Sequence, residues 1–112
     1  MAESELERAF DTLRIQLLGD LPEPKRGYQF NLPYTKHAID RAWVLCKVGI
    51  ELEGVFGRGK SRHTTPMGYT KDCTKYNLAA QRGWLILRYT RWHIDNDPVA
   101  MFAQIRRVLE SC

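Results

Sequence analysis

The chain has 112 residues, of which 44% are hydrophobic and 27% are charged, so it can bury one core and forms a single domain over residues 1–112. No segment approaches the ~20 consecutive apolar residues that cross a bilayer. The opening segment MAESELERAF is acidic and amphipathic, unlike a secretory signal. We therefore expect no membrane association and a cytoplasmic location.

The cysteines Cys46, Cys73 and Cys112 are odd in number and have no CxxC or CxxH spacing. This pattern indicates neither a disulfide framework nor a zinc site. We expect all of them to be reduced thiols.

Positive charge is concentrated in the middle of the chain. Lys and Arg outnumber Asp and Glu by 17 to 13 overall, and the excess is greatest between residues 58 and 75. The basic residues there are Arg58, Lys60, Arg62, Lys71 and Lys75, with His63 beside them and Asp72 as the only acid. Such a segment favours a polyanion through phosphate contacts and counterion release. We expect the first four of these basic residues to contact DNA, although basic loops are also common in proteins that bind no nucleic acid.

In chain order, the first predicted element is a helix over residues 4–18. Its inward positions recur at helical spacing and are Leu6, Phe10, Leu13 and Leu17. Ser4 and Glu7 have the spacing of a capping box. Glycine and proline between residues 19 and 24 end the helix. Three strands follow, around residues 27–31, 37–44 and 47–53.

The third of these strands is the most informative. Side chains alternate across a strand, so its apolar residues share one face while Glu51 and Glu53 project from the other. Residues 54–66 have no apolar period and form a predicted basic loop.

The second half of the chain predicts a helix over residues 68–82, a buried strand over 84–90 and a helix that Asp97 and Pro98 open and Leu109 ends. The inward positions predicted for the first of these helices are Tyr69, Cys73, Tyr76 and Ala80, and its rim carries Asp72, Lys75 and Arg82. The order α-β-β-β-α-β-α predicts an α/β (mixed α+β) fold, with a central mixed β-sheet flanked by helices.

Three carboxylates converge if the second and third strands form a hairpin that turns near Leu45. Asp40 then returns close to Glu51 and Glu53. Carboxylates so close repel one another unless a cation lies among them, and oxygen ligands of this kind select Mg²⁺ or Mn²⁺. The alternative is a solvated strand edge, with Asp40 paired to a neighbouring basic residue.

A family resemblance adds to this reading. The segments that carry it are Ile39-Asp40-Arg41-Ala42-Trp43, Val48-Gly49-Ile50-Glu51-Leu52-Glu53-Gly54, Arg62-His63, Gly68-Tyr69, Asp72, Lys75-Tyr76-Asn77, Gly83-Trp84 and Leu87-Arg88-Tyr89. In order and spacing they resemble the small phage and bacterial endonucleases of the PD-(D/E)xK superfamily, near the very-short-patch-repair branch. The likeness extends from about Leu6 to Thr90.

The resemblance implies a restriction-endonuclease-like core and a Mg²⁺-dependent DNA endonuclease, in which Mn²⁺ can substitute. Such an enzyme hydrolyses phosphodiester bonds, leaves a 5′-phosphate and acts in the cytoplasm of a bacterium or of a phage-infected host. It makes Asp40 the central metal ligand and Glu51 the second. Glu53 stands where the superfamily has lysine, and we expect it to join the metal site and to orient or deprotonate the attacking water. Ile39 stands at the proline position.

Three further assignments each have a simpler alternative. Lys75 could supply the missing positive charge, or form a surface pair with Asp72. Glu7 matches the first-helix glutamate that often completes the metal site, or only caps its helix. His63 could hold a phosphate or act as a general acid, or be an ordinary surface histidine.

Two rival functions remain open from the sequence. A Holliday-junction resolvase occurs on the same fold and would require a homodimer with two sites. A DNA-binding module without catalysis would need only the basic loop.

Overall fold

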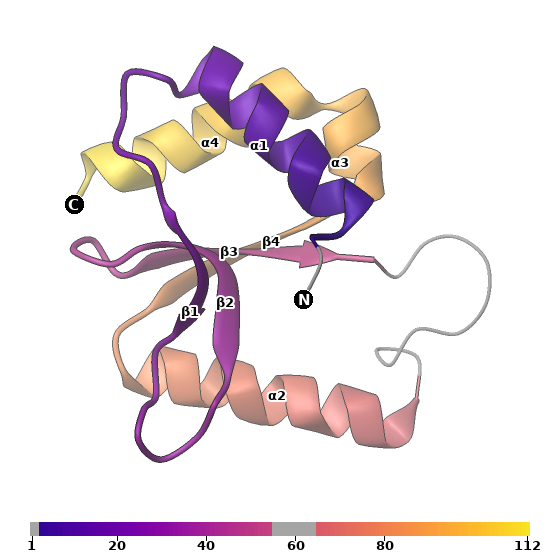
Figure 1. Cartoon of the computed structure of the whole chain (residues 1–112), viewed down its shortest axis with the longest axis vertical. Helices are drawn as coiled ribbons and strands as arrows, with labels where there is room; N and C mark the ends of the chain where they lie inside the picture. The colour runs from indigo at the N-terminus through magenta and orange to yellow at the C-terminus, as the bar shows by residue number, and fades with distance from the viewer. Residues whose placement is uncertain (1–2, 55–64) are drawn as a thin grey trace.

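The computed structural model describes residues 3–54 and 65–112. The described elements are α1 (Glu5–Leu17), β1 (Lys25–Gln29), β2 (Ala38–Trp43), β3 (Val48–Glu53), α2 (Pro66–Gln81), β4 (Leu85–Thr90), α3 (Arg91–Asn96) and α4 (Pro98–Glu110). The sheet lies between α2 on one face and α1, α3 and α4 on the other (Figure 1). The predicted mixed sheet flanked by helices is confirmed, and the short helix α3 is an addition.

The four strands lie side by side in sequence order. β1, β2 and β3 pair antiparallel, whereas β3 and β4 pair parallel. A parallel pair needs a long crossover, and α2 provides it across one face of the sheet. The predicted hairpin between β2 and β3 is confirmed, with its turn between Trp43 and Val48.

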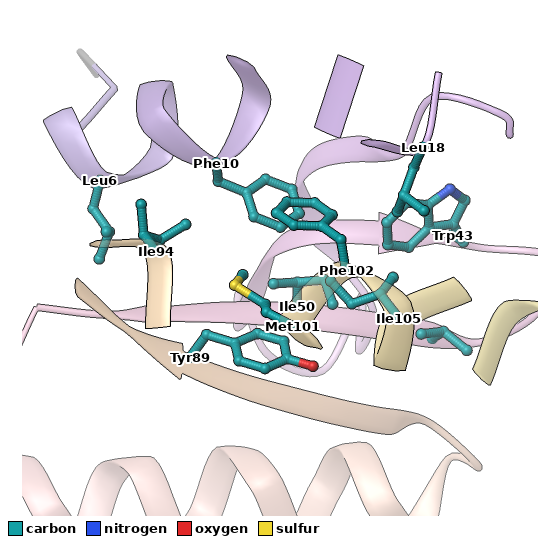
Figure 2. Packing of buried hydrophobic residues seen from close by; sticks show 11 residues of the cluster. Leu6, Phe10, Leu18, Trp43, Ile50, Tyr89, Ile94, Met101, Phe102 and Ile105 are labelled. Atoms are coloured by element: carbon teal, nitrogen blue, oxygen red, sulfur yellow. The ribbon is translucent and has the colours of Figure 1, made fainter. Parts of the chain in front are cut away.

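The larger core fills the space between the sheet and the helices α1, α3 and α4. Phe10 of α1 and Phe102 of α4 lie at its centre with ring centroids 5.2 Å apart (Figure 2). Ile50 of β3 and Ile105 of α4 are fully buried against them. The apolar face predicted for the third strand is therefore the floor of this core, and its other face is turned toward α2.

A smaller core lies between the sheet and α2. Its buried residues are Ile39, Ala42, Ala79 and Trp84. Gly49 lies in the same layer, where a Cβ atom would come within 2.7 Å of Ile39 Cγ2 and 2.8 Å of Ile86 Cδ1. Only glycine fits this position without displacing its neighbours, so β3 stays close to the side chains beneath α2.

The inward face of α2 differs from the predicted one. Its buried residues are Gly68, Asp72, Lys75 and Ala79, which keep the expected spacing but lie one residue earlier than the apolar set. Tyr69 is 65% exposed and Cys73 is also exposed. Two residues expected on the rim, Asp72 and Lys75, therefore face the sheet.

The cysteine prediction is wrong for two of the three residues. Cys46, in the turn between β2 and β3, forms a disulfide with Cys112 at the C-terminus, while Cys73 is a free thiol. The pairing joins residues 66 positions apart, so no local spacing could indicate it. Among the described residues, no helix is both long and apolar enough to cross a membrane.

Candidate active site

The site begins where β2 and β3 separate. Their backbone pairing ends at Arg41 and Ile50, and side chains replace the ladder beyond this point. The Asp40 backbone N–H donates to Glu51 Oε2 at 2.8 Å, and the Leu52 N–H donates to Asp40 Oδ2 at 2.9 Å. Both carboxylates are thus fixed by backbone donors in the gap between two diverging strands.

The strand alternation also breaks at Asp40. Ile39 and Ala42 both pack in the core beneath α2, although they are three residues apart. Arg41 and Trp43 lie on the opposite face, toward α1 and the larger core. Such a break turns Asp40 out of the regular pattern, so its carboxylate lies along the sheet toward β3.

Helix α2 places a cation and a hydroxyl over Glu51. Lys75 Nζ forms a buried ion pair with Glu51 Oε1, and the Tyr76 hydroxyl donates to the same oxygen at 3.2 Å. The Tyr76 hydroxyl also lies 3.1 Å from Glu53 Oε1. Burial and the charges of the two glutamates raise the pKa of Tyr76, so it remains a protonated donor.

Glu53 is engaged mainly on the β4 side. Arg88 Nε donates to Glu53 Oε1 at 2.6 Å, and the Arg88 guanidinium lies 4.3 Å from the centroid of the Tyr76 ring. Glu53 is buried, with 6% of its surface exposed. Its carboxylate therefore anchors Arg88 and Tyr76 beside the site, a role that the sequence did not indicate.

These carboxylates open into a pocket of about 520 Å³. The residues that line it are Lys36, His37, Ala38, Asp40, Glu51, Leu52, Glu53 and Lys75. Acidic and basic side chains face the same space. A pocket of this kind suits a ligand that is itself anionic when a cation offsets the carboxylates.

The two central carboxyls have raised pKa values. Burial raises the pKa of Asp40, with a smaller contribution from the charge of Glu7. Burial also raises the pKa of Glu51, followed by the negative charge of Asp40. A carboxylate whose ionisation is disfavoured by a neighbouring negative charge attracts a cation into the space between the two.

Two of the four residues predicted to bind metal, Asp40 and Glu51, fit a Mg²⁺ site. Within residues 3–54 and 65–112, no three His, Cys, Asp or Glu side chains are arranged to hold a metal ion. Mg²⁺ at phosphate-processing sites commonly takes one or two carboxylates together with water and substrate phosphate. Asp40 and Glu51 would supply that set, with Lys75 paired to Glu51 beside them, and Glu53 and Glu7 are paired with arginines.

Glu7 belongs to a separate ion cluster beneath Asp40. Arg41 is 1% exposed and forms a bidentate pair with Asp11, at 2.9 Å and 2.7 Å. Its Nη1 lies 3.4 Å from Glu7 Oε2 and donates to the backbone carbonyl of Asp40 at 2.7 Å. The predicted helix cap is half present, since the Glu7 N–H donates to Ser4 Oγ while the Glu7 side chain turns to Arg41.

The predicted DNA-binding residues lie largely outside the described part of the chain. Arg58, Lys60, Arg62 and His63 fall within residues 55–64, which the structure does not describe. Lys71 is exposed on α2. The alternative pairing of Lys75 with Asp72 gives way to the Glu51 pair.

Sequence reasoning missed four residues around the pocket. Tyr76 was expected in the core, and Arg88 was noticed only as part of a motif. Lys36 and His37 were given no role, although His37 stands three positions before Asp40. Proximity to Asp40 in sequence was the one available signal. Comparison of the chain with known families, curated proteins and solved structures gives no match.

Proposed function

We propose that the chain is a Mg²⁺-dependent DNA endonuclease of the PD-(D/E)xK type. The observation that carries the proposal is the convergence of Asp40, Glu51 and Lys75 in one pocket. An acidic residue on one strand, an acidic residue on the next and a lysine beside them are the groups named in the superfamily motif. The order and spacing of the motif segments along the sequence support the same assignment.

Asp40 and Glu51 would hold the metal ion. When bound there, Mg²⁺ supplies positive charge to the phosphate oxygens and acidifies bound water. Lys75, fixed by Glu51, orients the attacking water and offsets charge that develops on the phosphate. Hydrolysis forms a bond from the water oxygen to phosphorus, with loss of a water proton to solvent, and breaks the bond to the 3′ oxygen, which takes up a proton and leaves as a hydroxyl. The other product is a 5′-phosphate.

Lys75 suits the water-positioning role better than Glu53 does. Glu53 Oε1 already accepts from Arg88 Nε and lies 3.1 Å from the Tyr76 hydroxyl. Lys75 instead approaches the carboxylate that is proposed to bind metal. The lysine that relatives carry on the third strand is thus replaced by one from α2, and Glu53 holds the neighbouring side chains in place.

The proposed partner is DNA, with the basic residues of positions 58–71 contacting phosphates. We place the enzyme in the cytoplasm of a bacterium or of a phage-infected host, where its substrate is found. The Cys46–Cys112 disulfide is unusual for that compartment, because cytoplasmic thiols are normally maintained in reduced form. The carboxylate site does not include either cysteine.

A substrate panel tests the proposal. Purified protein is incubated in Mg²⁺, Mn²⁺ or EDTA with linear duplex, nicked duplex, flap and four-way-junction DNA. We expect metal-dependent cleavage with 5′-phosphate ends. A strong preference for the four-way junction, together with a dimer in solution, would select the resolvase alternative on the same site.

Isothermal titration with Mn²⁺ separates a nuclease from a DNA-binding module without catalysis. We expect one carboxylate-dependent metal site that is lost in Glu51→Gln and kept in Glu110→Gln, a control at the exposed end of α4. DNA binding without metal binding or cleavage would contradict the nuclease assignment.

A further inference from the structure

One wall of the pocket has no role in the mechanism described above. It is built by Lys36 and His37, which lie in the connection between β1 and β2, just before the strand that carries Asp40. They face the space that also contains Glu51 and Lys75. Two nitrogen-bearing side chains therefore border the carboxylates from an element other than α2.

The imidazole of His37 is held from two sides. Its Nδ1 lies 2.8 Å from Thr35 Oγ1, which accepts from Asn31 Nδ2 at 2.8 Å. Asn31 is only 2% exposed, so this chain of contacts begins inside the protein. The ring also stacks on Phe30, with centroids 6.5 Å apart and planes inclined by 27°. A histidine fixed in this way differs from a surface histidine that rotates in solvent.

The contact with Thr35 occupies Nδ1 of His37, so Nε2 is the nitrogen available to a ligand. Thr35 Oγ1 accepts from Asn31 Nδ2, and its own hydroxyl hydrogen can be donated to His37 Nδ1. In that arrangement the hydrogen of the neutral imidazole is on Nε2. In the described part of the chain, Nε2 has no hydrogen-bond partner, and it is left as a donor for a ligand.

We propose that His37 binds a phosphate of the DNA strand beside the Asp40–Glu51 pair, with Nε2 donating to a non-bridging oxygen. Lys36 adds its charge to the same phosphate. Thr35 and Asn31 act as positioning residues that hold the ring. The inference rests on the proposed function, because it takes the ligand of the pocket to be a phosphodiester.

The test compares variants of the full chain in single-turnover cleavage of a duplex oligonucleotide. For His37→Ala, we expect the DNA concentration that gives half-maximal rate to rise about 10–100-fold, the loss typical of a hydrogen bond to a charged group. Mn²⁺ affinity measured by calorimetry stays unchanged. His37→Gln keeps an N–H donor and retains affinity close to that of the wild type.

Two further comparisons separate a phosphate contact from a structural effect. Thr35→Val weakens DNA binding in the wild type but adds nothing in the His37→Ala background, because it acts through the imidazole. Lys36→Ala weakens binding more than Lys25→Ala, a control on exposed β1 outside the pocket. Unchanged half-saturation in His37→Ala, or an equal loss of metal affinity, would overturn the inference while leaving the nuclease assignment intact.

A readout without cleavage keeps the two proposals distinguishable. The ¹⁵N signals of the histidine side chains are followed while the wild-type protein is titrated with a single-stranded oligonucleotide. A shift at Nε2 of His37 supports the phosphate contact even if no DNA is cut, in which case only the hydrolytic function fails. Saturation of binding with no change at His37 would refute the contact.

Discussion

At the scale of single residues, the proposed assignment puts Glu53 at the strand position where the PD-(D/E)xK motif has lysine and takes the lysine from α2, as Lys75. The third strand carries Glu53, which pairs with Arg88, and the cation beside Glu51 comes from α2. A lysine from a helix reaches the same carboxylate because α2 crosses directly over this face of the sheet (Figure 1). The chemistry depends on where the ammonium lies, and the chain position that supplies it can vary.

Lys75→Met should therefore reduce cleavage by about 10²–10⁴-fold, the range expected when a positioned proton-handling or charge-stabilising group is lost. Glu53→Gln should lose much less, since the amide oxygen still accepts from Arg88. Lys25→Met, at an exposed position of β1 outside the pocket, serves as the charge-matched control. Equal losses in Lys75→Met and Lys25→Met would show that Lys75 acts only through general charge.

The raised pKa of Asp40 has a consequence for stability. In the metal-free folded protein, the Asp40 carboxyl keeps its proton at pH values above the ordinary pKa of 3.8. The free energy of unfolding therefore falls as the pH rises from 3.8 through the raised pKa. Asp40→Asn removes this contribution and keeps an acceptor for the Leu52 N–H. We expect the variant to melt at a higher temperature than wild type at neutral pH in EDTA.

Melting curves recorded from about pH 4 to pH 8 check this expectation, because the advantage should shrink as pH falls toward the ordinary Asp value. Excess Mg²⁺ should reduce or reverse the difference in melting temperature between Asp40→Asn and the wild type, since metal binding stabilises the wild type alone. Asp95→Asn, at an exposed residue of α3, should show no such pH pattern. The opposite trend, in which Asp40→Asn loses stability relative to wild type as pH rises from acid to neutral, would contradict burial as the main cause of the raised Asp40 pKa.

At the scale of elements, the Arg41 cluster joins α1 to the strand that carries Asp40. Arg41 is fully buried, and without its bidentate partner Asp11 it keeps only the longer carboxylate contacts to Glu7 and Glu3, at 3.4 Å and 3.6 Å. Asp11→Ala should lower the free energy of unfolding by about 3–5 kcal/mol, as for other buried pairs that lose one member. Denaturant unfolding measures the loss, and Glu5→Ala on the exposed side of α1 is the control. A change below about 0.5 kcal/mol would place Asp11 with ordinary surface residues.

The element scale also shows where sequence reasoning succeeds. Alternation over β3 correctly put Glu51 and Glu53 on one face, because an apolar core fixes the other face and a strand has only two. Periodicity in α2 gave the right spacing but the wrong face. Two of the inward positions of α2 are charged, because the helix covers the carboxylates of the sheet. A search for apolar periodicity cannot find a helix face whose buried residues are charged.

At the scale of the whole molecule, the pairing of β2 with β3 follows from a short connection, and this pairing was predictable. Three other features could not be predicted, because each joins segments far apart in sequence or depends on an ordered loop. They are the disulfide, the Arg41 ion cluster and the pocket wall formed by Lys36 and His37. Asn31 and Thr35 illustrate this: nothing in a polar turn indicates that it will hold an imidazole. The carboxylate pair was predictable because a single hairpin brings Asp40 to Glu51.

The disulfide ties the turn before β3 to the C-terminus, with the two Cα atoms 5.4 Å apart. The disulfide closes a loop of 66 residues and so lowers the conformational entropy of the unfolded chain. It should raise the free energy of unfolding of the oxidised protein by about 2–4 kcal/mol. Denaturant unfolding of wild type, with and without reductant, measures this. Cys46→Ser should match the reduced wild type, whereas Cys73→Ser should keep the response to reductant. Identical stability of the oxidised and reduced wild type would contradict the constraint.

The central claim is that Asp40 and Glu51 form the catalytic pair of a metal-dependent nuclease. Its most direct test is single-turnover cleavage of the best substrate in Mg²⁺ by wild type, Asp40→Asn and Asp95→Asn, each verified to be folded by its melting curve. The account predicts that Asp40→Asn falls to the uncatalysed background while Asp95→Asn cleaves at the wild-type rate. Cleavage by Asp40→Asn at the wild-type rate would contradict it.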